Sequence, residues 1–207
     1  MNLIKQNRMA ISVGVTGGIG SGKSMVSEIF KLFGVPVFEA DKEAKSLLNS
    51  NVDIRSKLTN LYGEDIYTPN GTVDRKKLAG IIFNNDIELS KVNKIVHPVV
   101  RLEYLEWLKK QDHPYVIHEA AILFESGFYK MMDFTILVSA PEEARIQRVA
   151  KRDNVTFEQV RERIVNQWSD EQKSELASLE IRNDNKKLII PQLIKIDKQL
   201  KENGKIW

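Results

Sequence analysis

The residues with the clearest chemical potential form one short stretch, Gly17-Gly18-Ile19-Gly20-Ser21-Gly22-Lys23-Ser24. Its spacing is that of a phosphate-binding P-loop, in which a glycine and four further residues precede Gly-Lys-Ser or Gly-Lys-Thr. Glycines allow backbone N–H groups to converge on an anion, and a helix that starts behind the loop adds the positive end of its dipole. In such a loop the Lys23 ammonium would reach the β- and γ-phosphates of a nucleotide, and the Ser24 hydroxyl would ligate Mg²⁺.

The sequence on either side supplies the elements that such a loop needs. Ile11–Val15 is apolar and β-branched, as expected of a buried strand. After the loop, apolar residues recur at helical spacing, and Gly34-Val35-Pro36 ends the run. The order strand, glycine loop, helix disfavours a chance match, and we expect a nucleotide-binding loop.

A carboxylate follows the next predicted strand. Val35–Glu39 is short and mostly apolar, and Asp41 comes directly after it. Ligands of open α/β sheets gather outside the carboxyl ends of the strands, where a kinase needs a carboxylate to orient a substrate hydroxyl and accept its proton. Asp is also favoured as a helix N-cap, and the two roles can coexist. Position alone does not decide between them.

From Ile54 to about Leu108 the alternation of strands and helices is lost, and three helical segments are predicted instead. We expect a helical insertion, which by analogy holds the second substrate in P-loop kinases. The last of its helices should continue past His97-Pro98 through Leu108. His97 has no partner motif, and an isolated histidine is more often packed or hydrogen-bonded than a ligand.

The sheet is predicted to resume at Tyr115–His118 and to continue with Phe134–Val138. A carboxylate just after a strand near a P-loop can support Mg²⁺ through water or position a substrate. Glu119 has that place, whereas Glu125 could equally be solvated.

Three arginines, Arg145, Arg148 and Arg152, are spaced to lie on one face of a helix that opens at Pro141. Thr156 with Gln159 forms a capping-box-like start of another helix. Mobile helices that carry arginines act as lids in phosphoryl transfer. A solvated face is the favoured interpretation for any single arginine, and a lid is the favoured one for the group.

Composition excludes several classes of function. The hydrophobic content of 42% and the charged content of 29% are typical of soluble globular proteins, and a net charge of +3 does not indicate a broad nucleic-acid surface. The absence of cysteine excludes disulfides, thiol catalysis and Cys-based metal sites. No apolar run approaches membrane-spanning length, so we expect a cytoplasmic protein without membrane or nucleic-acid partners. We interpret Met1–Arg8 as a polar lead-in and Met9 as a candidate alternative start, and the sequence does not indicate which methionine is used or what the oligomeric state is.

Landmarks across nearly the whole chain resemble the dephospho-coenzyme A kinase family. They are Val13–Ser24, Phe38–Asp41, Gly71–Arg75, His97-Pro98, Ile122–Glu125, Arg148 with Arg152-Asp153, Arg163, Gln167 and Asn183, in the family's order. The family transfers the γ-phosphate of ATP to the 3′-hydroxyl of dephospho-CoA, the last step of coenzyme A synthesis.

The resemblance implies roles for individual residues. The ATP-binding set would be Gly20, Ser21, Gly22, Lys23, Ser24, Met25, Arg152 and Asn183, with Asn183 near the adenine. Asp41, which matches the family's acidic residue after the second strand, would be the base. Lys23 and Arg148 would assist transfer, with Arg148 and Arg152 belonging to the lid. Dephospho-CoA would lie in the insertion, with Asp41, Arg75, His97 and Glu119 as its candidate contacts.

Two departures from the family pattern stand out. Glu119 occupies a position where the family commonly has Asp, and its side chain is one methylene longer. The second strand ends Phe38-Glu39-Ala40 rather than with the usual Ile-Asp-Ala. Neither change removes a group that cradles phosphate.

The sequence therefore predicts a single α/β domain over residues 1–207, with a P-loop-type parallel sheet flanked by helices. Its core is expected at about 9–50, 114–145 and 176–207, its helical substrate insertion at about 51–113 and its helical lid at about 146–175. ATP, Mg²⁺ and dephospho-CoA are the expected ligands. The alternatives are a kinase for another small hydroxyl or nucleoside monophosphate substrate and a nucleotide-dependent switch that binds a protein partner.

Overall fold

A computed structural model of the chain describes residues 10–82 and 85–206. The predicted lead-in Met1–Arg8 and the alternative start Met9 lie outside these residues. The chain divides into two compact units, which are described separately. The sheet unit comprises the residues up to Glu39 and from Leu108 onward, and the helical unit comprises Ala40–Trp107.

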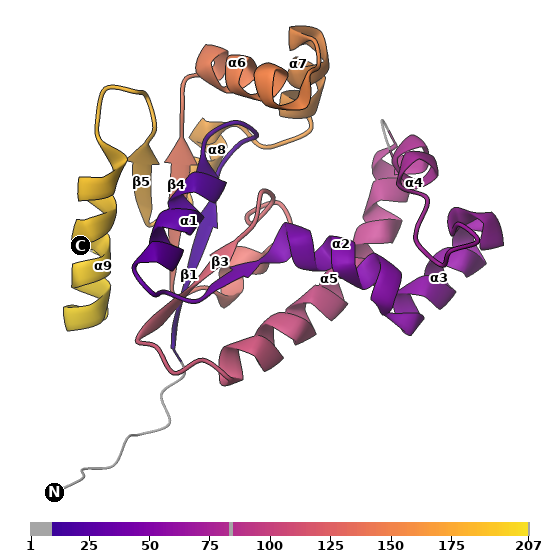
Figure 1. The fold of residues 1–207 in the computed structure, drawn as a ribbon, viewed down its shortest axis with the longest axis horizontal. Helices are drawn as coiled ribbons and strands as arrows, with labels where there is room; N and C mark the ends of the chain where they lie inside the picture. The colour runs from indigo at the N-terminus through magenta and orange to yellow at the C-terminus, as the bar shows by residue number, and fades with distance from the viewer. Residues whose placement is uncertain (1–9, 83–84, 207) are drawn as a thin grey trace, which may run out of the picture. The chain divides into compact units, whose positions relative to one another are not determined.

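The sheet unit is built on one five-stranded parallel sheet with the strand order β2-β3-β1-β4-β5 (Figure 1). The strands are β1 (Ile11–Thr16), β2 (Val37–Glu39), β3 (Tyr115–Glu119), β4 (Phe134–Ser139) and β5 (Leu179–Arg182). Because all five strands run in one direction, their carboxyl ends share one edge of the sheet. β1 is the central strand of the sheet, so the loop that follows it lies at the middle of that edge. The predicted parallel α/β fold is confirmed.

Near-complete burial explains why these segments form strands. The strand residues of β1, β3 and β4 are almost all buried and rich in Val and Ile, as parallel strands covered on both faces require. One core cluster joins Val13 and Ile136 of the strands to Phe30 and Leu193 of two helices. Those helices, α1 (Lys23–Leu32) and α9 (Ile189–Asn203), therefore cover the same face of the sheet.

Three further helices of the sheet unit follow β4 in sequence. They are α6 (Glu142–Asp153), α7 (Phe157–Val165) and α8 (Asp170–Ser174), and a short 3-10 turn η2 (Phe128–Met131) precedes β4. The predicted capping box is confirmed, because the Thr156 side chain accepts from the N–H of Gln159 and the Gln159 side chain from the N–H of Thr156. A second capping box, Ser169 with Gln172, starts α8 and was not anticipated.

The helical unit consists of four α-helices and a short 3-10 turn among its described residues. They are α2 (Ala40–Ser50), α3 (Val52–Tyr62), η1 (Glu64–Ile66), α4 (Arg75–Ile82) and α5 (Asp86–Lys109), of which the last two residues belong to the sheet unit. As predicted, α5 continues past Pro98. The unit starts at Ala40 and so includes α2, whereas the sequence predicted an insertion from about residue 51.

A histidine is buried in the sheet unit. His118 of β3 is fully buried, and its ring stacks on Phe38 and Phe128 with centroid distances of 5.5 and 4.5 Å. Burial between these rings lowers the pKa of His118 to about 3. The side chain is therefore neutral at physiological pH.

This burial predicts a pH-dependent stability. Between pH 3 and 6.5 the unfolded chain protonates His118 but the folded chain does not, so the free energy of unfolding should fall as the pH is lowered through this range. Protonation of His118 in the unfolded chain should make the free energy of unfolding about 2 kcal/mol smaller at pH 5 than at pH 7. Urea unfolding at both pH values should show a smaller difference for His118→Gln than for the original chain. If the free energy of unfolding falls equally in both chains between pH 7 and pH 5, the buried neutral His118 is not the cause.

Candidate active site

The glycine-rich stretch forms the predicted loop between β1 and α1. Ser21 donates its N–H to the carbonyl of Gly18 at 3.0 Å, and helix α1 starts at Lys23. Gly20 and Gly22 have φ angles of 80° and 100°, which L side chains rarely adopt. A Cβ on Gly22 would also lie 2.3 Å from Nδ2 of Asn183. Both the backbone angles and the close packing therefore require glycine here.

Glu119, the last residue of β3, lies beside the two functional side chains at the end of the loop. The Glu119 Oε1 atom is 3.8 Å from Nζ of Lys23 and accepts a hydrogen bond from Oγ of Ser24 at 3.4 Å. Glu119 is buried, and β-sheet register aligns it with Val15 of the central strand. The longer side chain at this position thus reaches both Lys23 and Ser24.

Two carbonyl groups of the loop accept hydrogen bonds from side chains of the sheet unit. Arg148 Nη1 donates to the carbonyl of Gly20 at 3.3 Å, and its Nη2 donates to the carbonyl of Asn183 at 3.1 Å and to Oδ1 of Asn185 at 3.0 Å. The Asn183 amide donates to the carbonyl of Ser21 at 2.7 Å. Arg148 and Asn183, both predicted site residues, therefore contact the loop backbone in this structure.

The remaining predicted substrate residues belong to the helical unit. Asp41 is the second residue of α2 and lies in its first turn, where a negative charge is favoured by the helix dipole. His97 lies on α5, and burial is the main cause that lowers its pKa; Arg101 acts in the same direction and Asp41 opposes it. Asp41 and His97 are thus close enough to interact, whereas Arg75 is an exposed residue at the start of α4.

Comparison with known proteins gives the family to which this loop belongs. A family model described as dephospho-CoA kinase matches residues 11–188. The chain belongs to the dephospho-CoA kinase family. Membership carries the family's reaction, the ATP-dependent phosphorylation of dephospho-CoA in the last step of coenzyme A biosynthesis.

Individual relatives match over almost the whole chain. The dephospho-CoA kinase of Bacteroides fragilis is 42% identical over 91% of this chain and 92% of its own length. That of Porphyromonas gingivalis is 38% identical over 90% of this chain and 92% of its own length. The solved dephospho-CoA kinase of Campylobacter jejuni superposes with a TM-score of 0.68 at 27% identity, covering 94% of this chain and 98% of that one.

Arg152, a residue predicted to contact ATP, is exposed and faces a neighbouring carboxylate. Its Nε atom lies 2.7 Å from Oδ1 of Asp153, and Arg163 Nη1 lies 2.8 Å from Oδ2 of the same residue. The hydrogen bond from Arg152 is the main cause that lowers the pKa of Asp153. The arginines of α6 therefore have different surroundings, and a role of Arg152 in ATP binding stays a prediction.

Glu125, which the sequence left as a possibly solvated residue, is instead part of a buried ion pair. Its Oε1 atom lies 3.1 Å from Nζ of Lys173, whose side chain is 0% exposed, and it also accepts the N–H of Trp168 at 3.1 Å. Lys173 further donates to the carbonyl of Ala121 at 3.4 Å, which accepts from Oγ1 of Thr16 as well. Burial lowers the pKa of Lys173, and Glu125 opposes that shift.

Sequence reasoning missed Lys173 and its neighbour Asp170. Both lie in Ser169–Ser174, a polar stretch that is typical of an exposed helix turn. The only local signal is the Ser169–Gln172 capping box, which indicates a helix start but not what the helix contacts.

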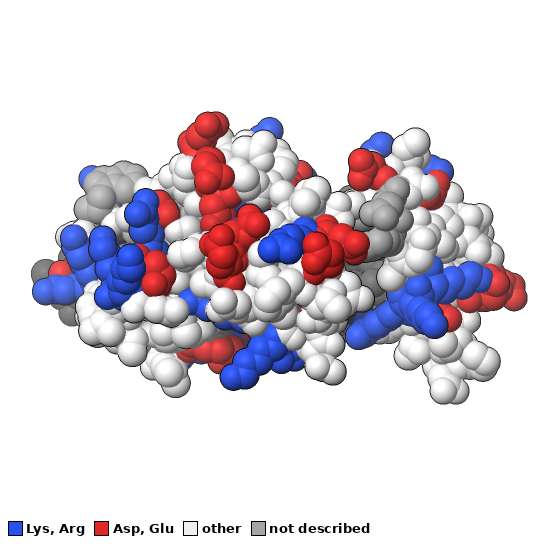
Figure 2. Space-filling model, turned by 90° about the horizontal axis from the view of Figure 1, so that it is seen from above, with Lys and Arg blue, Asp and Glu red and all other residues white. Residues whose placement is uncertain are grey.

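On the face seen in Figure 2, neither acidic nor basic side chains cover the whole surface. Within residues 10–82 and 85–206, none of the helices has both the length and the apolar character needed to cross a membrane.

Proposed function

We propose that this chain transfers the γ-phosphate of ATP to the ribose 3′-hydroxyl of dephospho-CoA. The observation that carries the proposal is the glycine loop at the end of the central strand, where the side chains of Lys23 and Ser24 both contact the carboxylate of Glu119. Membership of the dephospho-CoA kinase family supports the choice of phosphate donor and acceptor.

The loop would bind the triphosphate. The backbone N–H groups between Gly20 and Met25 face a phosphate in such loops, and the start of α1 adds its positive dipole end. Lys23, whose side chain is only 16% exposed, would neutralise charge that develops on the β- and γ-phosphates. The Glu119 carboxylate fixes the position of this ammonium.

The donor set beside the loop fits Mg²⁺. Oγ of Ser24 lies 3.4 Å from Oε1 of Glu119, so two hard oxygen donors stand together. No group of three His, Asp or Glu residues in the described part of the chain could hold a metal by itself, so the ion would be held jointly with the nucleotide phosphates. Ser24 would ligate it directly and Glu119 through water. When bound, Mg²⁺ would supply further neutralisation of the phosphate charge.

Asp41 would orient the acceptor hydroxyl and accept its proton. Its support is chemical and sequential, because it is a carboxylate two positions after the last residue of β2, at the carboxyl end of that strand. Its electrostatic interaction with His97 links it to a second candidate contact of dephospho-CoA, and Arg75 is a third. In-line attack requires only that the hydroxyl be aligned, and a positioned base contributes to the rate.

The helical unit also offers room for part of the acceptor. A cavity of about 810 Å³ is lined by residues that include Arg55, Tyr67, Thr68 and Asp74. The Arg55 guanidinium lies 4.6 Å from the centre of the Tyr67 ring and donates to the carbonyl of Gly71 at 3.1 Å.

The segment from about 146 to 175 would act as the lid. Arg148 and Arg152 would add positive charge over the transferring phosphate, and closure would exclude the water that could hydrolyse ATP. Arg152 would have to leave Asp153 to do so, whereas Arg148 already lies against the loop carbonyl of Gly20.

The test is ADP release by the purified chain with Mg-ATP, with and without dephospho-CoA, and with product mass. Rapid, acceptor-dependent release with a gain of one phosphate is expected. If ATP binds but dephospho-CoA gives no stimulation, the acceptor assignment is wrong and other hydroxyl acceptors must be tested. Slow hydrolysis that depends on a protein partner would indicate a switch instead.

A further inference from the structure

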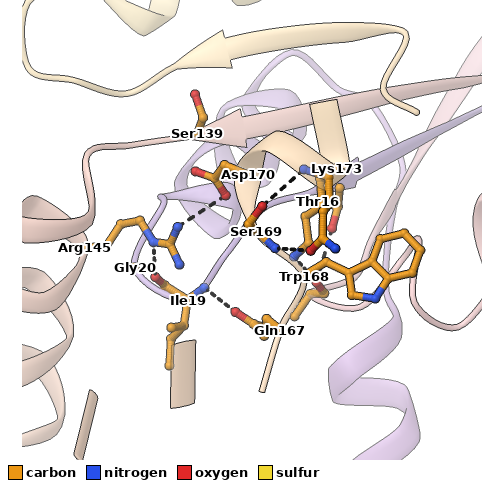
Figure 3. Close-up of polar contacts among 12 residues, drawn as sticks. Thr16, Ile19, Gly20, Ser139, Arg145, Gln167, Trp168, Ser169, Asp170 and Lys173 are labelled. Carbon is orange, nitrogen blue, oxygen red and sulfur yellow. Dashed lines mark hydrogen bonds and ion pairs between the residues drawn. The ribbon is translucent and has the colours of Figure 1, made fainter. Parts of the chain in front are cut away.

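One residue of the loop, Ile19, is held from three directions by the segment that follows β4. Its N–H donates to Oε1 of Gln167 at 2.8 Å, and its carbonyl accepts from Nε of Arg145 at 3.1 Å (Figure 3). Its side chain packs against the small core of α6 and α7, which includes Val149 and Val160. Backbone and side chain of Ile19 are therefore both fixed by residues outside the loop.

Arg145 is itself immobilised. It is only 6% exposed, and its Nη1 lies 3.3 Å from Oδ1 of Asp170. The N–H of Ala140 also stabilises the Asp170 carboxylate, although burial raises the pKa of Asp170. Gly18 makes room for the guanidinium, because a Cβ there would lie 2.4 Å from Nη2 of Arg145. The Arg145 charge is thus paired within the protein and directed at the loop backbone.

Gln167 is fixed by its neighbours in the chain. Its own N–H donates to the carbonyl of Ile164 at the end of α7, and the next residue, Trp168, donates to Glu125. The Ser169 capping box then starts α8, which the buried Lys173 anchors. The Gln167 amide is therefore presented to Ile19 from a short segment that is held at both ends.

The geometry of the peptide bond gives these contacts a consequence for the phosphates. The carbonyl of Ile19 and the N–H of Gly20 belong to one planar trans peptide, so they point in opposite directions. By holding the carbonyl, Arg145 sets the direction of the Gly20 N–H, the first of the amides expected to face phosphate. Arg148 and Asn183 hold the next two carbonyls, those of Gly20 and Ser21, in the same way. Three successive carbonyl oxygens are thereby turned toward protein donors.

We infer that Gln167 and Arg145 are positioning residues for the phosphate-binding loop, which they hold through the two peptide groups of Ile19. Neither side chain needs to touch ATP for this role. The inference rests on the proposed function only in requiring that the loop bind ATP. The N–H of Ile19 precedes the amides from Gly20 to Met25, so phosphate binding by those amides leaves this N–H available to Gln167.

The experiment compares Gln167→Met with Gln147→Met. Gln167→Met keeps the length of the side chain but removes the acceptor, and Gln147 is an exposed residue of α6 that serves as the matched control. Calorimetric titration with Mg-ATP and with adenosine is done without acceptor, together with thermal unfolding. We expect Gln167→Met to weaken Mg-ATP binding roughly fivefold to tenfold, as loss of one well-placed hydrogen bond would, and to leave adenosine binding unchanged. Gln147→Met should match the original chain for both ligands.

The outcomes separate the inference from the function on which it rests. If the original chain does not bind Mg-ATP, the proposed function fails. If it binds and Gln167→Met binds Mg-ATP equally well, or loses ATP and adenosine affinity in proportion, the positioning role is overturned. Arg145→Met combined with Asp170→Asn removes the second contact without leaving a buried unpaired carboxylate, and it should show the same selective loss for Mg-ATP.

Discussion

Replacing Lys23 by alanine should reduce kcat for dephospho-CoA phosphorylation by at least about 10²- to 10³-fold, the usual effect of removing one donor that stabilises transition-state charge. The side chain is mostly buried and its ammonium lies 3.8 Å from Glu119, so water cannot readily replace it. Phosphoryl transfer depends almost entirely on positioning and charge stabilisation, which leaves few groups to compensate. Acceptor-dependent ADP release measures the loss directly.

Lys31→Ala provides the control for this prediction. Lys31 is a lysine of the same helix, but it is exposed and pairs with Glu28 and Glu39. Exposed ion pairs contribute little to stability, so this variant should stay folded. Because Lys31 is not a residue of the phosphate-binding loop, the variant should also keep the original rate. Thermal unfolding of both variants checks that the chains are folded. A folded Lys23→Ala protein with a kcat within tenfold of the original would remove Lys23 from the catalytic machinery.

Replacing Asp41 by asparagine should lower kcat by about 10²- to 10⁴-fold, the range for loss of a positioned general base. Asparagine has the same shape and keeps a hydrogen-bond acceptor, but it does not take up the proton of the attacking hydroxyl. Asp41 is not part of the loop that binds ATP, so the KM for ATP should change less than kcat. Steady-state kinetics with both substrates varied would separate the two parameters.

Glu43→Gln is the matched control for Asp41→Asn. Glu43 lies in the same first turn of α2 and carries the same charge, so both variants lose an equal interaction with the helix dipole. We expect Glu43→Gln to retain kcat. Turnover at the original rate in Asp41→Asn would refute the assignment of Asp41 as the base.

The loop could be predicted from sequence because its causes are local. Glycines at the turning points, an apolar strand before them and an amphipathic helix behind them lie within Ile11–Phe33, and each follows from residue type and spacing. The parallel sheet was predictable for the same reason, since nearly continuous Val- and Ile-rich segments such as Phe134–Val138 must be buried on both faces.

The surroundings of single charged residues could not be predicted in this way. Arg145, Arg148 and Arg152 are spaced along one helix, yet the first is buried against Asp170, the second donates to the loop and the third is exposed. Helical spacing gives the direction of a side chain but not what a distant segment places there. The pattern of α2 likewise does not indicate which compact unit the helix packs with, and it lies in the unit Ala40–Trp107.

The ion pair between Glu125 and Lys173 has a consequence for how such a sequence can change over time. Removal of one partner leaves an uncompensated charge in the interior and costs about 3–5 kcal/mol, a large part of the stability of an ordinary domain. A pair of apolar residues of similar volume could be tolerated, but each single step toward it passes through a chain with one orphaned charge. We therefore expect residues 125 and 173 to be replaced together or retained together in proteins that descend from this chain.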